Sequence, residues 1–452
     1  MKKRFLKNVA WLQAANVTSL LFAFLIQYGY FLQDDVLGKK FFAFFLGIFV
    51  IFEAFRLLLN WEPGDILINK IAAEREDLQQ SYALARQGLY FSVSFAILCS
   101  LCLFFSADIV VDLFFRKWLH HNNNAVRDIL VNTVTWASLI PLIHTFHLWA
   151  VNILQAKEQM KASSPLLIAI NLSRPLGALC GLEYARRYVQ LQNPIDYFPY
   201  MIKGVLVVYS LSFIFSAILV KKHYPGLLLS FLKSGWSMPD KKMTKEIFQL
   251  CSSKKIMELY TRFPMWLSVV YLTPETFTLM TLSLKLFEYS KIPFAPISKT
   301  LLPQYSRLYR EKRYKHLKSQ VKQVNLWGLV SALIICVMGS ISCLYILLPE
   351  FILLNHQDIS LITHNAYPLL PCLFFVGLSI SNGILLIIFD MTKLFLKLSL
   401  IQIPLCALAS YFLISHYGFL GVCLYTLFYH AITNLASKYF AEKKLCELQK
   451  VT

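Results

Sequence analysis

The sequence predicts an all-α polytopic membrane protein with about twelve transmembrane helices. The chain has 452 residues, is 57% hydrophobic and has a mean hydropathy of +0.54. Only 15% of its residues are charged, whereas soluble domains contain about 25%. Apolar runs of about 20 residues recur along the whole length, which suits membrane-spanning helices better than the shorter alternating strands of a barrel. No stretch is long and polar enough to form a separate soluble domain.

The first apolar run follows the basic segment Met1–Lys7 and extends to about Leu32. This run is too long for the core of a signal peptide and further apolar runs follow it, so we expect a retained first helix. The predicted spans are 9–32, 38–60, 83–106, 126–154, 163–184, 199–220, 246–272, 274–303, 324–348, 364–389, 394–414 and 417–437.

Lys and Arg residues between the predicted spans are distributed unevenly. Twenty-seven lie on one side of the membrane and seven on the other. The seven are Lys39, Lys40, Arg116, Lys117, Arg127, Arg186 and Arg187. Because the cytoplasmic side carries the excess of basic residues, we expect both termini to be cytoplasmic. The net charge of +19 is then explained by this bias and by anionic lipids, and it does not indicate nucleic acid.

Positive charge inside the predicted spans is concentrated at 246–310. Lys255, Glu258 and Arg262 share one stripe of the first helix in this stretch, and Lys254 is adjacent. A charge in hydrocarbon costs several kcal/mol, so such residues normally face a polar cavity or a partner. Lys285, Glu288 and Lys291 follow on the second helix. We therefore expect a cation-lined passage for an anionic substrate.

An internal repeat relates the two halves of the chain. Phe52–Arg56 (Phe-Glu-Ala-Phe-Arg) resembles Phe287–Lys291 (Phe-Glu-Tyr-Ser-Lys), and the offset is 235 residues. Two pairs of lysines in matching loops recur at nearly the same offset. The pattern predicts two six-helix lobes in parallel orientation, at 1–220 and 246–452, joined by a basic cytoplasmic linker at 221–245. Chance similarity between apolar helices is the alternative.

Three short motifs resemble those of a known transporter group. They are Pro293–Tyr309 after the eighth span, Tyr417-Gly418-Phe-Leu-Gly421-Val before the twelfth, and Asn171-Leu-Ser-Arg174-Pro in the fifth. This set resembles the polysaccharide-transport branch of the multidrug/oligosaccharidyl-lipid/polysaccharide exporter (MOP) superfamily, which includes the Wzx-type O-antigen flippases. The resemblance implies a V-shaped pair of lobes, as in the multidrug and toxic-compound extrusion (MATE) transporters, working by alternating access.

The same resemblance implies a substrate: a polyprenyl-diphosphate-linked saccharide, an O-antigen or other surface-polysaccharide unit, carried across the inner membrane. Lipopolysaccharide-assembly proteins would be its partners. The diphosphate must cross about 30 Å of hydrocarbon, and Arg or Lys in a low-dielectric cavity can stabilise it. The residues expected to bind it are Arg262, Lys285, Lys255, Lys254, Arg174, Arg56 and Lys291. Glu53, Glu258 and Glu288 are expected to form gating ion pairs, and the i, i+3 spacing pairs Glu53 with Arg56 and Glu288 with Lys291. An ion pair that only holds a lobe together is the alternative for each. No metal, cofactor or enzyme activity is expected.

Two other functions stay open. A MATE-type drug or cation antiporter requires intramembrane carboxylates, but here Glu53, Glu258 and Glu288 each have a cation three or four residues away. A polytopic O-antigen polymerase or ligase would use the same lipid carrier and typically has a large outer loop. The longest outer loop expected here covers only 107–125.

Overall fold

A computed structural model describes most of the chain, and every regular element in the described residues is a helix. The described ranges are 11–31, 38–59, 61–73, 77–119, 124–157, 159–189, 191–227, 230–231, 238–291, 311–342, 356–389 and 391–450, with gaps of one or two residues in the first, third and seventh, together with isolated residues between 294 and 309. The chain divides into two compact units, Met1–Lys255 and Ile256–Thr452. This division falls inside one long helix, and the six-helix lobes with a linker at 221–245 stay a prediction.

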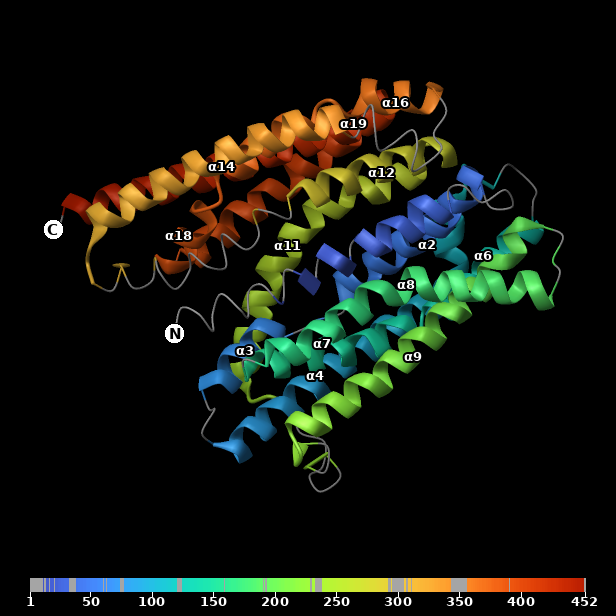
Figure 1. Ribbon diagram of the computed structural model, residues 1–452, viewed down its shortest axis with the longest axis horizontal. Helices are drawn as coiled ribbons and strands as arrows, with labels where there is room; N and C mark the ends of the chain where they lie inside the picture. Colours follow the sequence, from blue (N-terminus) through green and yellow to red (C-terminus); the bar gives the residue numbers. More distant parts are fainter. Residues whose placement is uncertain are drawn as a thin grey trace. The chain divides into compact units, whose positions relative to one another are not determined.

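The first unit is a set of long helices packed side by side, among which α4, α7, α8 and α9 form the centre (Figure 1). Its helices are η1 (Leu25–Tyr30), α2 (Gly38–Leu59), α3 (Gly64–Ala73), α4 (Leu78–Phe105), α5 (Ala107–Phe115), α6 (Asn124–Ala137), α7 (Ile140–Ala156), α8 (Met160–Tyr188), η2 (Pro194–Tyr197) and α9 (Phe198–His223). Trp149 on α7 donates from Nε1 to the Ala85 carbonyl at 2.8 Å, which satisfies the polar atom of a buried ring.

Glycines let α8 and α9 approach each other backbone to backbone. A Cβ built on Gly181 would lie 2.1 Å from the Tyr200 carbonyl oxygen, and one on Gly204 would lie 2.2 Å from the Gly177 carbonyl oxygen. Gly177 and Gly181 are four residues apart and therefore share one face of α8. This arrangement is the small-xxx-small packing that membrane helices use where lipid supplies no hydrophobic drive for association.

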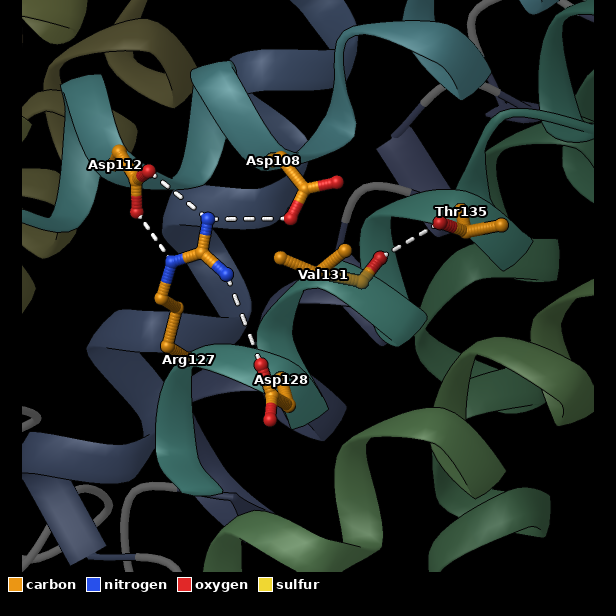
Figure 2. A network of polar contacts seen from close by, with 6 residues as sticks. All are labelled: Asp108, Asp112, Arg127, Asp128, Val131 and Thr135. Atoms are coloured by element: carbon orange, nitrogen blue, oxygen red, sulfur yellow. Dashed lines mark hydrogen bonds and ion pairs between the residues drawn. The ribbon is translucent and has the colours of Figure 1, made fainter. Parts of the chain in front are cut away.

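The segment predicted as the longest outer loop, 107–125, begins with helix α5. Four of its apolar residues, Ala107, Val110, Val111 and Phe115, recur at helical spacing and are buried, whereas Ile109 and Leu113 are exposed. The polar face of α5 meets α6 through Arg127 (Figure 2). Arg127 donates two hydrogen bonds to Asp112, at 2.6 and 2.9 Å, and lies 3.1 Å from Asp108 and 3.7 Å from Asp128. At nine residues, α5 is too short to cross a membrane.

The second unit contains the end of α11 and all later helices. They are α11 (Lys241–Tyr271), α12 (Pro274–Ser290), α14 (Tyr314–Ser342), α16 (His356–Ala366), α17 (Leu369–Leu378), α18 (Asn382–Ile388) and α19 (Thr392–Lys450). Gly328 on α14 and Gly377 on α17 meet as the glycines of α8 and α9 do, since a Cβ on Gly328 would lie 2.2 Å from the Gly377 carbonyl oxygen.

Helix α19 is two helices joined at Gly418. The backbone at Gly418 has φ 56° and ψ −123°, which is not helical. A Cβ on Gly421 would lie 2.0 Å from the Leu413 carbonyl oxygen, although eight residues of straight helix rise about 12 Å. The chain therefore folds back on itself here, at the boundary expected between spans 394–414 and 417–437.

Seven helices in the described residues are long and apolar enough to cross a membrane, and the bent pair formed by α16 and α17 makes an eighth. Helix α19 counts once in that total despite its reversal at Gly418. Helices α11 and α12 occupy predicted spans 246–272 and 274–303 without entering the count. The first predicted span, 9–32, lies partly outside the described residues. The all-α polytopic fold class is confirmed.

Candidate functional site

The first unit contains a half-buried group of charges, Glu53, Arg56 and Arg174, which we name the first cationic cluster. Arg56 donates from Nε to Glu53 Oε2 at 2.9 Å, and Arg174 donates from Nη2 to Glu53 Oε1 at 2.6 Å. The side chain of Glu53 is 14% exposed, and those of both arginines are 23% exposed. Two guanidinium groups share one carboxylate, so the cluster carries one unit of excess positive charge.

Aromatic rings fix the orientation of Arg174. Its guanidinium carbon lies 5.2 Å from the ring centroid of Phe49 and 5.0 Å from that of Phe52. Both distances are within the range of cation–π attraction. Since Phe49, Phe52 and Glu53 all belong to α2, one helix holds the arginine of another through two rings and a carboxylate.

Two histidines on α7, His144 and His147, are buried in the first unit. The His144 ring packs edge-on against Tyr209, with centroids 6.1 Å apart. His147 makes polar contacts through both ring nitrogens, with the Ser216 hydroxyl at 2.8 Å and the Tyr209 carbonyl oxygen at 3.1 Å. Both side chains thus contribute to the interior of the first unit.

The second unit contains a related group, Arg262, Lys285, Glu288 and Lys291, which we name the second cationic cluster. Lys285 Nζ lies 2.6 Å from Glu288 Oε2, and these side chains are 35% and 46% exposed. Arg262 on α11 and Lys291 at the end of α12 are close enough to act on Glu288 electrostatically. Three cations accompany one carboxylate, so positive charge is again in excess.

The two clusters correspond in part at the predicted repeat offset of 235 residues: Phe52 matches Phe287, Glu53 matches Glu288 and Arg56 matches Lys291. Arg174, Arg262 and Lys285 have no charged counterpart at this offset. In each unit a cation lies over the phenyl ring. Arg174 Cζ is 5.0 Å from the centroid of the Phe52 ring, and Lys291 Nζ is 4.4 Å from that of the Phe287 ring. In each unit the glutamate is also ion-paired.

The partners of the two glutamates differ. Arg56 pairs with Glu53 as expected, but Glu288 pairs with Lys285 rather than making its short contact to the expected Lys291. The helical spacing i, i+3 permits either partner. The difference matters because Lys285 was expected to bind the substrate, and an ion pair is the alternative role for it.

The remaining predicted residues lie on α11. Lys255 is engaged within the first unit, since its Nζ lies 4.3 Å from the centroid of the Trp61 ring and 3.4 Å from the Leu58 carbonyl oxygen. Glu258 is exposed. The Lys254 side chain, and most of the motif Pro293–Tyr309, lie outside the described residues.

Sequence reasoning missed the ion pair between Arg174 and Glu53 and the aromatic rings beneath Arg174. These residues are 121 positions apart, and helical periodicity gives no partner on another helix. The phenylalanine preceding the glutamate in both halves of the repeat was the available signal for a cation–π contact.

Several solved structures share this arrangement of helices. An inward-facing multidrug-resistance MATE transporter of the MOP superfamily superposes with a TM-score of 0.70 over 96% of both chains, at 13% identity. The chain has the MOP transporter fold. An outward-facing MATE transporter matches this MOP fold with a TM-score of 0.59 at 12% identity, over 99% of this chain and 97% of the other.

A MOP superfamily transporter from Pyrococcus furiosus also matches, with a TM-score of 0.60 and 13% identity, over 98% of this chain and 96% of the other. For that protein, reversed polarity of the binding pocket is described as suggesting a different function. No protein-family model and no curated protein sequence matches the chain. At these identities, the likeness establishes the MOP fold.

Proposed function

We propose that this protein is a flippase that moves a polyprenyl-diphosphate-linked saccharide across the membrane. The observation that carries the proposal is the excess of cations in both clusters, where each glutamate is already ion-paired. An added anion is attracted to such a group, whereas an added cation is repelled by it. A diphosphate is the multiply charged anion that a membrane-embedded lipid carrier brings into hydrocarbon.

The geometry of the clusters suits a phosphate group. Arg174 has a planar guanidinium held between rings and carboxylate, with several N–H donors, and guanidinium groups bind phosphate oxygens in pairs. Lys285 and Lys291 supply compact charges on mobile stems. The half-exposed side chains of Lys285 and Glu288 are accessible to a ligand without rearrangement of the helices.

A drug or cation antiporter is the second candidate, because multidrug MATE transporters share this MOP fold. The intramembrane acids Glu53 and Glu288 are the groups that such a transporter would use. Both must first leave the arginine or lysine that holds them. The excess of cations around each acid makes this function less favourable than anion transport.

The experiment is a flipping assay with purified protein in proteoliposomes. A fluorescent polyprenyl-diphosphate saccharide is followed by its accessibility to an impermeant quencher. We expect the wild type to flip this lipid, and Arg174→Gln, Arg262→Gln and Lys285→Gln to be at least about tenfold slower, since each removes a charge-assisted contact of roughly 1.5–3 kcal/mol. Lys222→Gln, an exposed lysine at the end of α9, is the matched control and should retain the wild-type rate.

Two results would contradict the proposal. One is equal flipping in the wild type and in all three variants. The other is that the protein takes up a cationic dye in exchange for an ion that moves down its gradient, and does not flip the lipid. That result would establish the antiporter. The lipid without its diphosphate should not be flipped, and this second control separates recognition of phosphate from recognition of the saccharide.

A further inference from the structure

Exposed residues on one face of α14 change abruptly in chemistry along the helix. Lys315, Lys318 and Lys322 are exposed in its first turns. Leu326, Val330, Leu333 and Val337 continue the same face and are 61%, 40%, 52% and 50% exposed. All seven lie within one stripe of a 3.6-residue helix. The change from lysine to aliphatic side chains occurs between Lys322 and Leu326, about 6 Å along the axis.

The C-terminal part of α19 runs beside the start of α14 (Figure 1). Lys318 Nζ donates to Gln449 Oε1 at 3.2 Å, and Gln449 Nε2 donates to the Tyr314 carbonyl oxygen at 3.4 Å. Leu317 and Leu445 are buried on these two helices. Residues 311–322 and 438–450 thus form one structure, which we name the basic end.

The basic end carries surplus positive charge. It contains nine Lys and Arg residues and three Glu residues. The glutamates already have partners in three ion pairs: Glu311 with Arg313, Glu442 with Lys438 and Glu447 with Lys444. Lys315, Lys322 and Lys443 are exposed and have no carboxylate partner in the described part of the chain.

Aromatic side chains mark the level at which the charge ends. Trp327 on α14 and Tyr439 on α19 are 63% and 60% exposed. Trp and Tyr are enriched where the hydrocarbon of a bilayer meets its headgroups. Lysines on one side of these rings and exposed aliphatic residues on the other indicate a helix that enters a bilayer at this level.

We propose that the basic end binds the headgroups of anionic phospholipids in the membrane that holds the protein. Phosphate groups of these lipids lie at the level of Lys315, Lys322 and Lys443, while their chains cover Leu326 and the residues that follow. An acidic soluble protein would match the charge but would not account for the continuation of the lysine stripe into exposed aliphatic residues. The proposal concerns lipid at the outside of the helices and is independent of the transported substrate.

The test uses the full-length protein in nanodiscs with spin-labelled phosphatidylglycerol or phosphatidylcholine. We expect the wild type to prefer phosphatidylglycerol, and the preference to fall by about threefold or more in the triple variant Lys315→Gln, Lys322→Gln, Lys443→Gln, because basic residues near a membrane surface each contribute attraction to anionic lipid. The control removes three other exposed cations, Arg116→Gln, Lys117→Gln and Arg187→Gln, and should change the preference much less.

A second measurement locates the binding. The difference in fluorescence between the wild type and Trp327→Phe gives the signal of Trp327. Brominated phosphatidylglycerol should quench this signal, and should quench it less in the triple variant. Equal affinity of the wild type for both lipids, or an equal loss in the control variant, overturns the proposal. Retention of an acidic soluble protein through these lysines, with no lipid preference, would assign the basic end to a protein partner instead.

Discussion

Arg174 on α8 and Glu53 on α2 are joined by a 2.6 Å hydrogen-bonded ion pair between Nη2 and Oε1. The contact links helices that are far apart in the sequence, and it takes place beside two phenylalanine rings. Glu53 also accepts from Arg56. The carboxylate is therefore the common partner of two arginines, and its removal affects both.

Glu53→Gln should destabilise the first unit. Breaking a buried ion pair by removing one partner costs roughly 3–5 kcal/mol. Because Arg56 and Arg174 keep 23% of their side-chain surface exposed, we expect a smaller loss, about 2–3 kcal/mol. Thermal unfolding of the purified protein measures this. Glu275→Gln, at an exposed carboxylate in the first turn of α12, is the control, and equal melting temperatures for both variants would show that Glu53 adds no stability.

Exchange of the two charges on α12 separates a structural role from contact with substrate. In the double variant Lys285→Glu, Glu288→Lys the pair at i and i+3 is retained and the total charge is unchanged. If the pair only stabilises the helix, the double variant flips lipid at the wild-type rate while Lys285→Glu alone does not. We expect flipping to stay at least about tenfold reduced, since the cation that meets the phosphate has moved.

Gly181→Val should disrupt the packing of α8 against α9. The first side-chain carbon would lie 2.1 Å from the Tyr200 carbonyl oxygen, and a backbone atom cannot move aside as a flexible side chain can. We expect a loss of at least about 2 kcal/mol, typical of severe overpacking. Ser210→Val, at an exposed position on α9, is the matched control. An unchanged melting temperature in Gly181→Val would contradict the close approach of these helices.

Gly418→Ala should destabilise the reversal within α19, and Gly418→Asn should not relieve the defect. Asparagine tolerates the left-handed region near ψ of about +45°, but Gly418 has ψ −123°. Glycine adopts this conformation readily, whereas for any other residue it costs about 1–3 kcal/mol. The melting temperature of each variant relative to the parent measures this cost. Equal melting temperatures with Ala, Asn and Gly at position 418 would contradict the non-helical backbone conformation at this residue.

The ion pair between Asp112 and Arg127 should weaken only in strong acid. Hydrogen bonds from Arg127 hold the pKa of Asp112 below its ordinary value of 3.8. A lowered pKa stabilises the folded state at pH above 3.8, and this contribution is lost as the pH falls through the pKa of the folded state. The effect is at most about 1 kcal/mol, because the Asp112 side chain is 55% exposed.

Melting temperatures of the wild type and Asp112→Asn at pH 7, 5 and 3.5 check this dependence. The difference between them should be equal at the two higher values and smaller at the lowest. Asp128→Asn is the comparison, since Asp128 is 74% exposed and 3.7 Å from Arg127. A difference that shrinks already between pH 7 and 5 would contradict the lowered pKa.

The helices were predictable because apolar runs and helical periodicity are local properties of the chain. The spans 199–220 and 246–272 appear within α9 and α11. Periodicity also placed Lys255, Glu258 and Arg262 on one helix, and α11 contains all three. The division into spans 394–414 and 417–437 anticipated the reversal at Gly418.

Contacts between helices could not be predicted in the same way. Arg174 pairs with Glu53 because α8 packs near α2. No local sequence pattern indicates that these two helices are neighbours. Lys255 was expected to meet substrate, but its ammonium group lies over Trp61, a ring whose proximity depends on tertiary packing. The i, i+3 spacing of Lys285 and Glu288 permits this ion pair. The repeat, which matches Lys291 with Arg56, favoured Lys291 as the partner of Glu288 instead.

The sharing of Glu53 by two arginines limits how tightly the first cationic cluster can hold an anion. A ligand that approaches Arg174 competes with a carboxylate already bound at 2.6 Å, so its net gain is a difference between two similar attractions. When the ligand leaves, Glu53 closes the same contact again and no desolvated charge is left behind. In the flippase that we propose, the internal carboxylate is a counter-ion that keeps occupancy of the cluster brief, as release of a transported substrate requires.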